Sequence, residues 1–163
     1  MKKTLKGFTL IELIIVIAVI ALLAAATFVA INPAKRVGDA NNSRRWSDVT
    51  AIADAYSAYL ADNSGAHPTT TSAGATYSIA TTTGGTGFAT CQAKTGNPTT
   101  TSALVDLSAL VTGGYLGQIP LDPGFSYGTD NRNTGYYMYR ESTGKMIVGA
   151  CDSYNTQNIE VVR

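Results

Sequence analysis

The chain has 163 residues, of which 45% are hydrophobic and 14% are charged, and its formal net charge is +1. A chain so close to neutral does not have the clustered Lys and Arg of an electrostatic nucleic-acid binder. Its length suits one domain in addition to any anchoring segment.

The first 31 residues form a short basic segment followed by an apolar one. Three lysines precede Gly7, and the 24 residues 8–31 contain only three polar side chains, one of them Glu12. As a helix this segment would be about 36 Å long, which exceeds the ~30 Å hydrocarbon core of a bilayer. Because the lysines come first, we expect a cytoplasmic N-terminus and export of the residues after about 32.

Glu12 is unexpected inside an apolar segment. A carboxylate there costs about 2.5–3.5 kcal/mol on insertion scales and usually has a partner. The segment contains no cationic side chain. We therefore expect the partner to come from another chain or from a new amine, and cleavage after Gly7 would create such an amine on Phe8.

Residues 6–13, Lys-Gly-Phe-Thr-Leu-Ile-Glu-Leu, resemble the processing site of type IV pilins and type II secretion pseudopilins. The resemblance implies that a membrane aspartic protease cleaves between Gly7 and Phe8. It also implies that the same enzyme methylates the new amine on Phe8, and that Glu12 pairs with the N-terminus of a neighbouring subunit during assembly.

An ordinary secretory signal peptide is the alternative, because it too has a basic segment followed by an apolar one. Residues 24–26 are all alanine and offer a cleavage site of the A-x-A kind. Glu12, the Gly-Phe junction and the continuation of the apolar segment to Ile31 favour the pilin-type leader. Removal of residues 1–7 would leave nine basic and eleven acidic side chains.

We predict one long helix over residues 8–62, with a kink or short break at Asn32-Pro33 because proline disfavours helical geometry before it. Its first half is apolar all round and its second half is amphipathic. The apolar stripe of the second half has helical spacing and comprises Trp46, Val49, Ala53, Tyr56 and Leu60. We expect this half to pack on a small C-terminal antiparallel sheet, which gives an α+β, pilin-like fold.

Residues 66–102 are rich in Thr, Ser, Gly and Ala and read either as a long loop or as a loop with short strands. The best strand candidate is 76–80. We predict a helix over 102–111 with Ser102 as its N-cap. Residues 115–123, Tyr-Leu-Gly-Gln-Ile-Pro-Leu-Asp-Pro, again resemble the pilin and pseudopilin family.

The C-terminal part predicts strands at 135–140, 145–151 and 159–162, with a glycine-containing turn at 141–144. The two cysteines, Cys91 and Cys151, are a natural disulfide pair in an exported domain. This bond would connect the sheet to the threonine-rich region.

Catalytic and metal sites are not indicated. The single histidine, His67, lies in a loop without an obvious acid–base partner, and we expect no cofactor. Asp122 and Asp130 flank a loop that could hold Ca²⁺, but no acidic run accompanies them, so we expect no metal. Residues 44–46, Arg-Arg-Trp, could stack on nucleic-acid bases, but we favour exposed arginines and a buried Trp46.

The resemblance implies a structural filament subunit rather than an enzyme. Residues 1–7 would be the leader peptide, 8–31 the transmembrane and filament-core helix, and 32–163 the exported globular domain. We expect a single-pass inner-membrane protein that joins a homo-oligomeric helical filament at the cell surface, for adhesion, motility or DNA uptake. Its partners would be a prepilin peptidase and methylase and an inner-membrane assembly platform.

Two other functions fit the same N-terminus. The chain could be a pseudopilin of a type II secretion system, or a membrane-anchored extracytoplasmic binding module that never polymerises. A domain of about 130 residues with a disulfide and a threonine-rich variable region favours a surface pilin.

Overall fold

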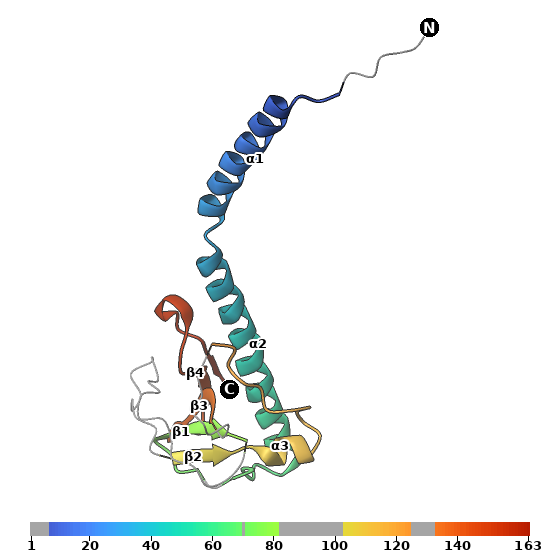
Figure 1. The fold of residues 1–163 in the computed structure, drawn as a ribbon. Coiled ribbons are helices and arrows are strands. Elements are labelled where there is room, and N and C mark those ends of the chain that lie inside the picture. The colour runs from blue at the N-terminus through green and yellow to red at the C-terminus, as the bar shows by residue number, and fades with distance from the viewer. Residues whose placement is uncertain (1–6, 70, 82–102, 125–132) are drawn as a thin grey trace. The chain divides into compact units, whose positions relative to one another are not determined.

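The computed structural model describes residues 7–69, 71–81, 103–124 and 133–163 and divides the chain into two units, Met1–Val37 and Gly38–Arg163. Helices and strands are both present, which confirms the α+β class (Figure 1). In chain order the elements are α1 Leu10–Ile31, α2 Pro33–Asp62, β1 Ala75–Ala80, β2 Ala103–Asp106, α3 Ser108–Thr112, β3 Asn133–Arg140, β4 Met146–Ala150, the 3-10 turn Tyr154–Thr156 and β5 Glu160–Val162.

The predicted break between the helices lies at Asn32. This residue ends α1 in the left-handed conformation, with φ 46° and ψ 78°, which asparagine tolerates better than most residues. Its side-chain Oδ1 then accepts a hydrogen bond from the Lys35 amide at 3.3 Å. Pro33 occupies the first position of α2, where the absence of an amide proton costs nothing. Asn32 thus ends one helix and caps the next.

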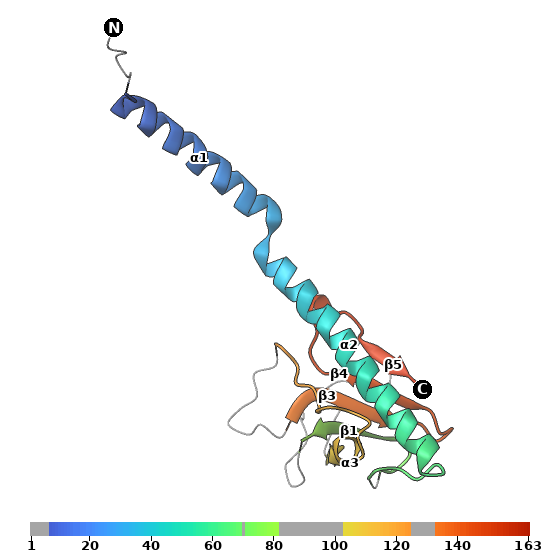
Figure 2. The ribbon, with the colours of Figure 1, turned by 90° about the vertical axis from the view of Figure 1, so that its right-hand side faces the viewer.

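The second unit is built around one face of α2. Its buried residues recur every three or four positions: Gly38, Asn42, Arg45, Val49, Ile52, Ala53, Ala55 and Tyr56. The apolar members share a core with Ile79 of β1, Met138 of β3 and Val148 of β4. Figure 2 shows this part of α2 lying across one face of the sheet.

The burial predicted for the apolar stripe of α2 is confirmed for its central residues and wrong for its first residue. Val49, Ala53 and Tyr56 are buried as expected, whereas Trp46 is 38% exposed. Arg45 takes the inward position instead and is 3% exposed. Both residues lie within a helical turn of Val49, so spacing alone does not distinguish them.

The sheet has five strands in the order β2-β1-β3-β4-β5. The strands predicted in the C-terminal part are confirmed as β3, β4 and β5, which pair antiparallel. The expectation of an entirely antiparallel sheet is wrong, because β1 and β2 are parallel. A parallel pair needs a long crossover connection, and the 22 residues between Ala80 and Ala103 are long enough to supply it.

The helix predicted over 102–111 is also wrong over its first half. Residues 103–106 form β2, and only Ser108–Thr112 is helical; Ser102 lies outside the described residues. Asp106 Oδ1 accepts a hydrogen bond from the Ser108 amide at 2.8 Å and turns the chain from strand to helix. A short apolar run is compatible with a helix or a strand. Here it forms a strand because it pairs with β1.

Residues 115–123, the second stretch that resembles the pilin and pseudopilin family, cover the end of α2. The rings of Tyr115 and Tyr59 pack edge to face, with their centroids 5.4 Å apart. The Tyr115 hydroxyl donates a hydrogen bond to the Asp62 carboxylate at 3.0 Å. Ile119 is buried in the core. The stretch therefore has a packing role in this chain.

Candidate functional site

The Gly7–Phe8 junction lies outside regular secondary structure. Residues 7–9 precede the first turn of α1, and the Phe8 side chain is 89% exposed. Proteolysis favours exposed backbone that is not tied into a helix. The predicted cleavage site is therefore accessible without unwinding α1.

Thr9 and Glu12 form a capping box at the start of α1. The Thr9 amide and hydroxyl donate to Glu12 Oε2 at 2.9 and 2.8 Å, and the Glu12 amide donates back to Thr9 Oγ1 at 3.3 Å. These hydrogen bonds within the segment were not expected, while the cationic partner predicted for Glu12 stays a prediction. The spacing of Thr and Glu is the known signature of this cap and was readable in the sequence.

The cap gives Glu12 hydrogen bonds but no opposite charge. Residues 7–31 contain no Lys, Arg or His. The exposed carboxylate lies four residues after Phe8, on which cleavage after Gly7 would create an amine. The site can therefore still accept a cation from a second molecule.

The surface of α1 is apolar and exposed. None of its 22 residues is buried. Leu10 is 76% exposed, Leu22 72% and Val29 81%. Leu10–Asp62 contains a stretch long and apolar enough to cross a membrane, judged by length and composition, and it is the single such region among the described residues.

Small residues gather on the second half of α1, at positions that include Ala21 and residues 24–26, and Ala18 lies just before it. Small side chains let helices approach closely in an apolar environment, where packing and dispersion drive association. The one hydroxyl of this half is satisfied locally, since Thr27 donates to the Ala24 carbonyl at 2.9 Å. α1 is therefore suited to lipid and to packing against other helices.

The cluster at 44–46 differs from the favoured interpretation. The Arg44 side chain is 60% exposed as expected, but Arg45 is buried against Asp122 and Trp46 is partly exposed, which is the reverse of the expectation for these two residues. Both carboxylate oxygens of Asp122 accept hydrogen bonds from Arg45. Asp122 is therefore already neutralised, which disfavours it as a Ca²⁺ ligand, and Asp130 lies outside the described residues.

Only one of the two cysteines of the predicted disulfide is among the described residues. Cys151 follows β4, and its amide donates to the Gly135 carbonyl at 2.9 Å. Cys91 lies outside the described residues. The pairing of the two cysteines stays a prediction.

Comparison with known protein families identifies the N-terminus. Residues 2–28 match the prokaryotic N-terminal methylation motif, which confirms the resemblance seen at residues 6–13. The match includes most of α1 and ends before its last residues. Comparison with curated proteins and with solved structures gave no significant match.

Proposed function

Because this chain carries the prepilin leader signature of type IV pilins and type II secretion pseudopilins, we propose that it is a structural subunit of a type IV pilus-like filament. The signature and the apolar α1 indicate a membrane-anchored, exported protein that a prepilin peptidase processes, and a structural subunit rather than an enzyme. The proposal adds cleavage after Gly7, N-methylation of Phe8 and polymerisation through α1.

The observation that carries the proposal is the uncovered surface of α1. Burial of a Leu, Ile, Val or Phe side chain contributes about 1.5–3 kcal/mol, and α1 presents many of them with none buried. Before assembly, lipid would cover these side chains. In the filament, the α1 helices of other copies would replace the lipid.

Glu12 fits both environments. In the single chain, Thr9 supplies its hydrogen bonds. In the filament, the methylated amine of Phe8 from a neighbouring copy would supply the missing positive charge. Such a pair contributes more reliably to specificity than to stability, and here it would set the axial register between subunits.

The proposed route leads from the inner membrane to the cell surface. An inner-membrane assembly platform would take the processed chain from lipid and add it to the growing filament. Residues 32–163 would be exported, with Cys91 and Cys151 joined in the oxidising compartment outside the membrane. A surface filament of this kind serves adhesion, motility or DNA uptake.

Electron microscopy of sheared surface material tests the proposal. Cells that express this chain as the sole subunit should yield thin filaments that an antibody against the chain labels along their length. Full-length chain that stays in the membrane fraction without filaments would contradict polymerisation and favour an anchored binding module. Loss of protein secretion on deletion, without surface filaments, would favour a pseudopilin.

A further inference from the structure

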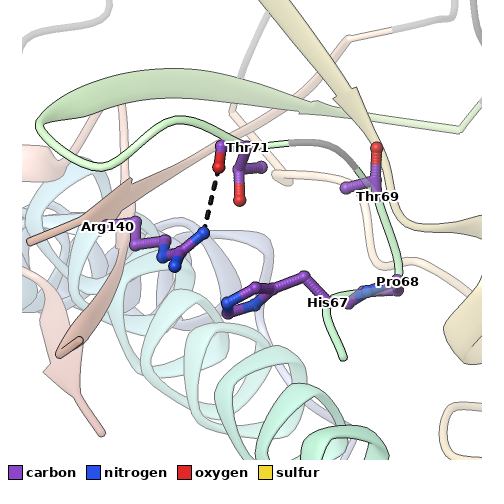
Figure 3. Close-up of a pocket in the computed structure, with 5 residues that line it drawn as sticks. All are labelled: His67, Pro68, Thr69, Thr71 and Arg140. Carbon is purple, nitrogen blue, oxygen red and sulfur yellow. Dashed lines mark hydrogen bonds between the residues drawn. The ribbon is translucent and has the colours of Figure 1, made fainter. Parts of the chain in front are cut away.

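A hollow with a mixed polar and apolar lining lies in the second unit, between the loop that follows α2 and the end of β3. Its volume is about 480 Å³, and Figure 3 shows its lining residues, His67, Pro68, Thr69, Thr71 and Arg140. This volume falls in the range of small-molecule sites, roughly 300–1,000 Å³. The proposed function makes no use of this hollow.

Arg140 supplies a positive charge that the described residues leave without an ion-pair partner. Its Nη1 donates to the Thr71 carbonyl at 3.0 Å, which fixes one edge of the guanidinium. Its Nε is buried and has no hydrogen-bond partner among the described residues. Buried polar atoms are normally paired, and an acceptor that entered the hollow at the Nε–Nη2 edge of the guanidinium would satisfy this one.

The opposite wall adds further polar groups. Thr71 is 8% exposed, and its Oγ1 makes no hydrogen bond of ordinary geometry within the described part of the chain. The Thr71 hydroxyl nevertheless lies close enough to the Tyr56 hydroxyl to lower the pKa of that phenol against the effect of its burial. His67 Nδ1 lies 2.8 Å from the hydroxyl of Tyr56, which is itself 1% exposed. When the phenol donates this hydrogen bond, the ring proton is on Nε2, and the imidazole offers a second donor.

Among the lining residues of the hollow, Arg140 carries a positive charge and none carries a negative charge. Burial, and then the nearby charge of Arg140, lower the pKa of His67 below its usual value. The imidazole is therefore neutral near pH 7, and Arg140 alone carries charge. One cation matches a singly charged group better than a doubly charged one.

We propose that this hollow binds the carboxylate of an acidic sugar. The free edge of the Arg140 guanidinium has the fork geometry that suits a carboxylate. The hydroxyls of Thr69 and Thr71 and the His67 ring match the hydroxyls of a sugar, and the Pro68 ring offers an apolar surface to its C–H groups. The inference does not depend on polymerisation and goes beyond the proposed function.

Titration of the full-length chain in detergent micelles tests the proposal. The probes are glucuronate, glucose as the uncharged match and inorganic phosphate as the competing anion, followed by saturation-transfer NMR and calorimetry. Glucuronate should bind. Glucose should bind at least about tenfold more weakly, since it lacks the charge-assisted contact, which contributes about one tenfold step or more. Phosphate should also bind at least about tenfold more weakly, because it lacks the sugar hydroxyls and C–H groups that the threonines, His67 and Pro68 would contact. Equal binding of phosphate or of glucose would overturn the proposal.

Variants distinguish the effect of the paired N–H donors of the guanidinium from the effect of its charge. Arg140→Lys keeps the charge and loses the fork, so glucuronate binding should weaken by about tenfold or more. Arg44→Lys is the matched control at a side chain that is 60% exposed, and it should change nothing. If Arg140→Lys fails to fold, Thr69→Val tests the same wall and should also weaken binding. Unchanged glucuronate affinity in a folded Arg140→Lys variant would overturn the proposal.

Discussion

Arg45 and Asp122 form a buried ion pair that joins α2 to the stretch ahead of β3. Arg45 Nε donates to Oδ2 at 2.6 Å and Nη2 donates to Oδ1 at 2.8 Å, with side chains that are 4% and 0% exposed. The hydrogen bonds to Asp122 raise the pKa of Arg45 further above its usual value. Arg45 Nη1 also donates to Asn42, whose amide group donates to the Tyr154 carbonyl. The pair is therefore the centre of a network that also holds the C-terminal loop.

Asp122→Asn should lower the free energy of unfolding by roughly 3–5 kcal/mol, because it leaves the Arg45 charge buried without a counter-charge. Urea unfolding of the full-length chain in detergent measures the change. Asp54→Asn is the control. It removes the exposed pair with Arg163, whose side chain is 42% exposed against 58% for Asp54, and should cost about 1 kcal/mol or less. Equal losses in the two variants would contradict a special role for the buried pair.

Glu12→Ala should leave processing largely intact and abolish filaments, because the growing polymer loses the charge that sets its register. Glu12→Gln distinguishes the charge from the helix cap, since glutamine also fits a capping box, and it too should abolish filaments. Thr9→Ala removes the cap, keeps the charge and should retain filaments. Immunoblot mobility reports processing and electron microscopy reports assembly. Abundant normal filaments from Glu12→Gln as sole subunit would refute the pairing.

The mature chain should begin with N-methyl-Phe8. Removal of residues 1–7 and addition of one methyl group define a single expected mass, which intact-mass spectrometry of the purified protein measures. The same measurement on cells without prepilin peptidase should give the uncleaved chain. A first residue of Thr27 would instead support an ordinary signal peptide.

Cys91 and Cys151 should be joined in the exported protein. The loop that they close has about 60 residues, so the chain-entropy expression gives roughly 4 kcal/mol of stabilisation. Cys91→Ser, Cys151→Ser and the double variant should lose similar amounts, because each removes the same bond. Thiol labelling under denaturing conditions provides the direct check, and two reactive thiols in protein taken from the cell surface would show that the bond is absent.

Acidification should destabilise the second unit partly through His67. Its pKa is lowered in the folded chain, so below the ordinary value of about 6.5 the unfolded state binds more protons than the folded one. Stability is thus fully present above that pH and is lost as pH falls through the lowered pKa. His67→Gln should flatten the dependence of the urea midpoint between about pH 7 and 5. An unchanged slope in this variant would show that other groups cause it.

Features that depend on neighbouring residues were predictable from the sequence. The leader is one uninterrupted motif, the break at Asn32 follows from a proline, and the β3–β4 hairpin follows from two strand-like runs around Gly144. The capping box of Thr9 and Glu12 is equally local, because the threonine and the glutamate are three residues apart, the spacing that this cap requires.

Features that depend on distant residues were not predictable. Arg45 points inward because it pairs with Asp122, which is 77 residues away in the sequence. No pattern in the residues around Arg45 predicts that contact. The strand β2 exists because β1 offers it a parallel edge, while its own sequence fits a helix equally well. Likewise, the hollow at Arg140 arises only when β3 is placed beside the loop that contains His67.

Asn32 has a further consequence for how this protein can be re-engineered. α2 starts with its own proline and its own cap, the Asn32 side chain on the Lys35 amide, so its first turn takes no hydrogen bond from residues 10–31. We therefore expect that α1 can be replaced without loss of the first turn of α2. A chimera joined just before Asn32 can carry an N-terminal helix of another length or packing pattern and keep α2 and the second unit unchanged.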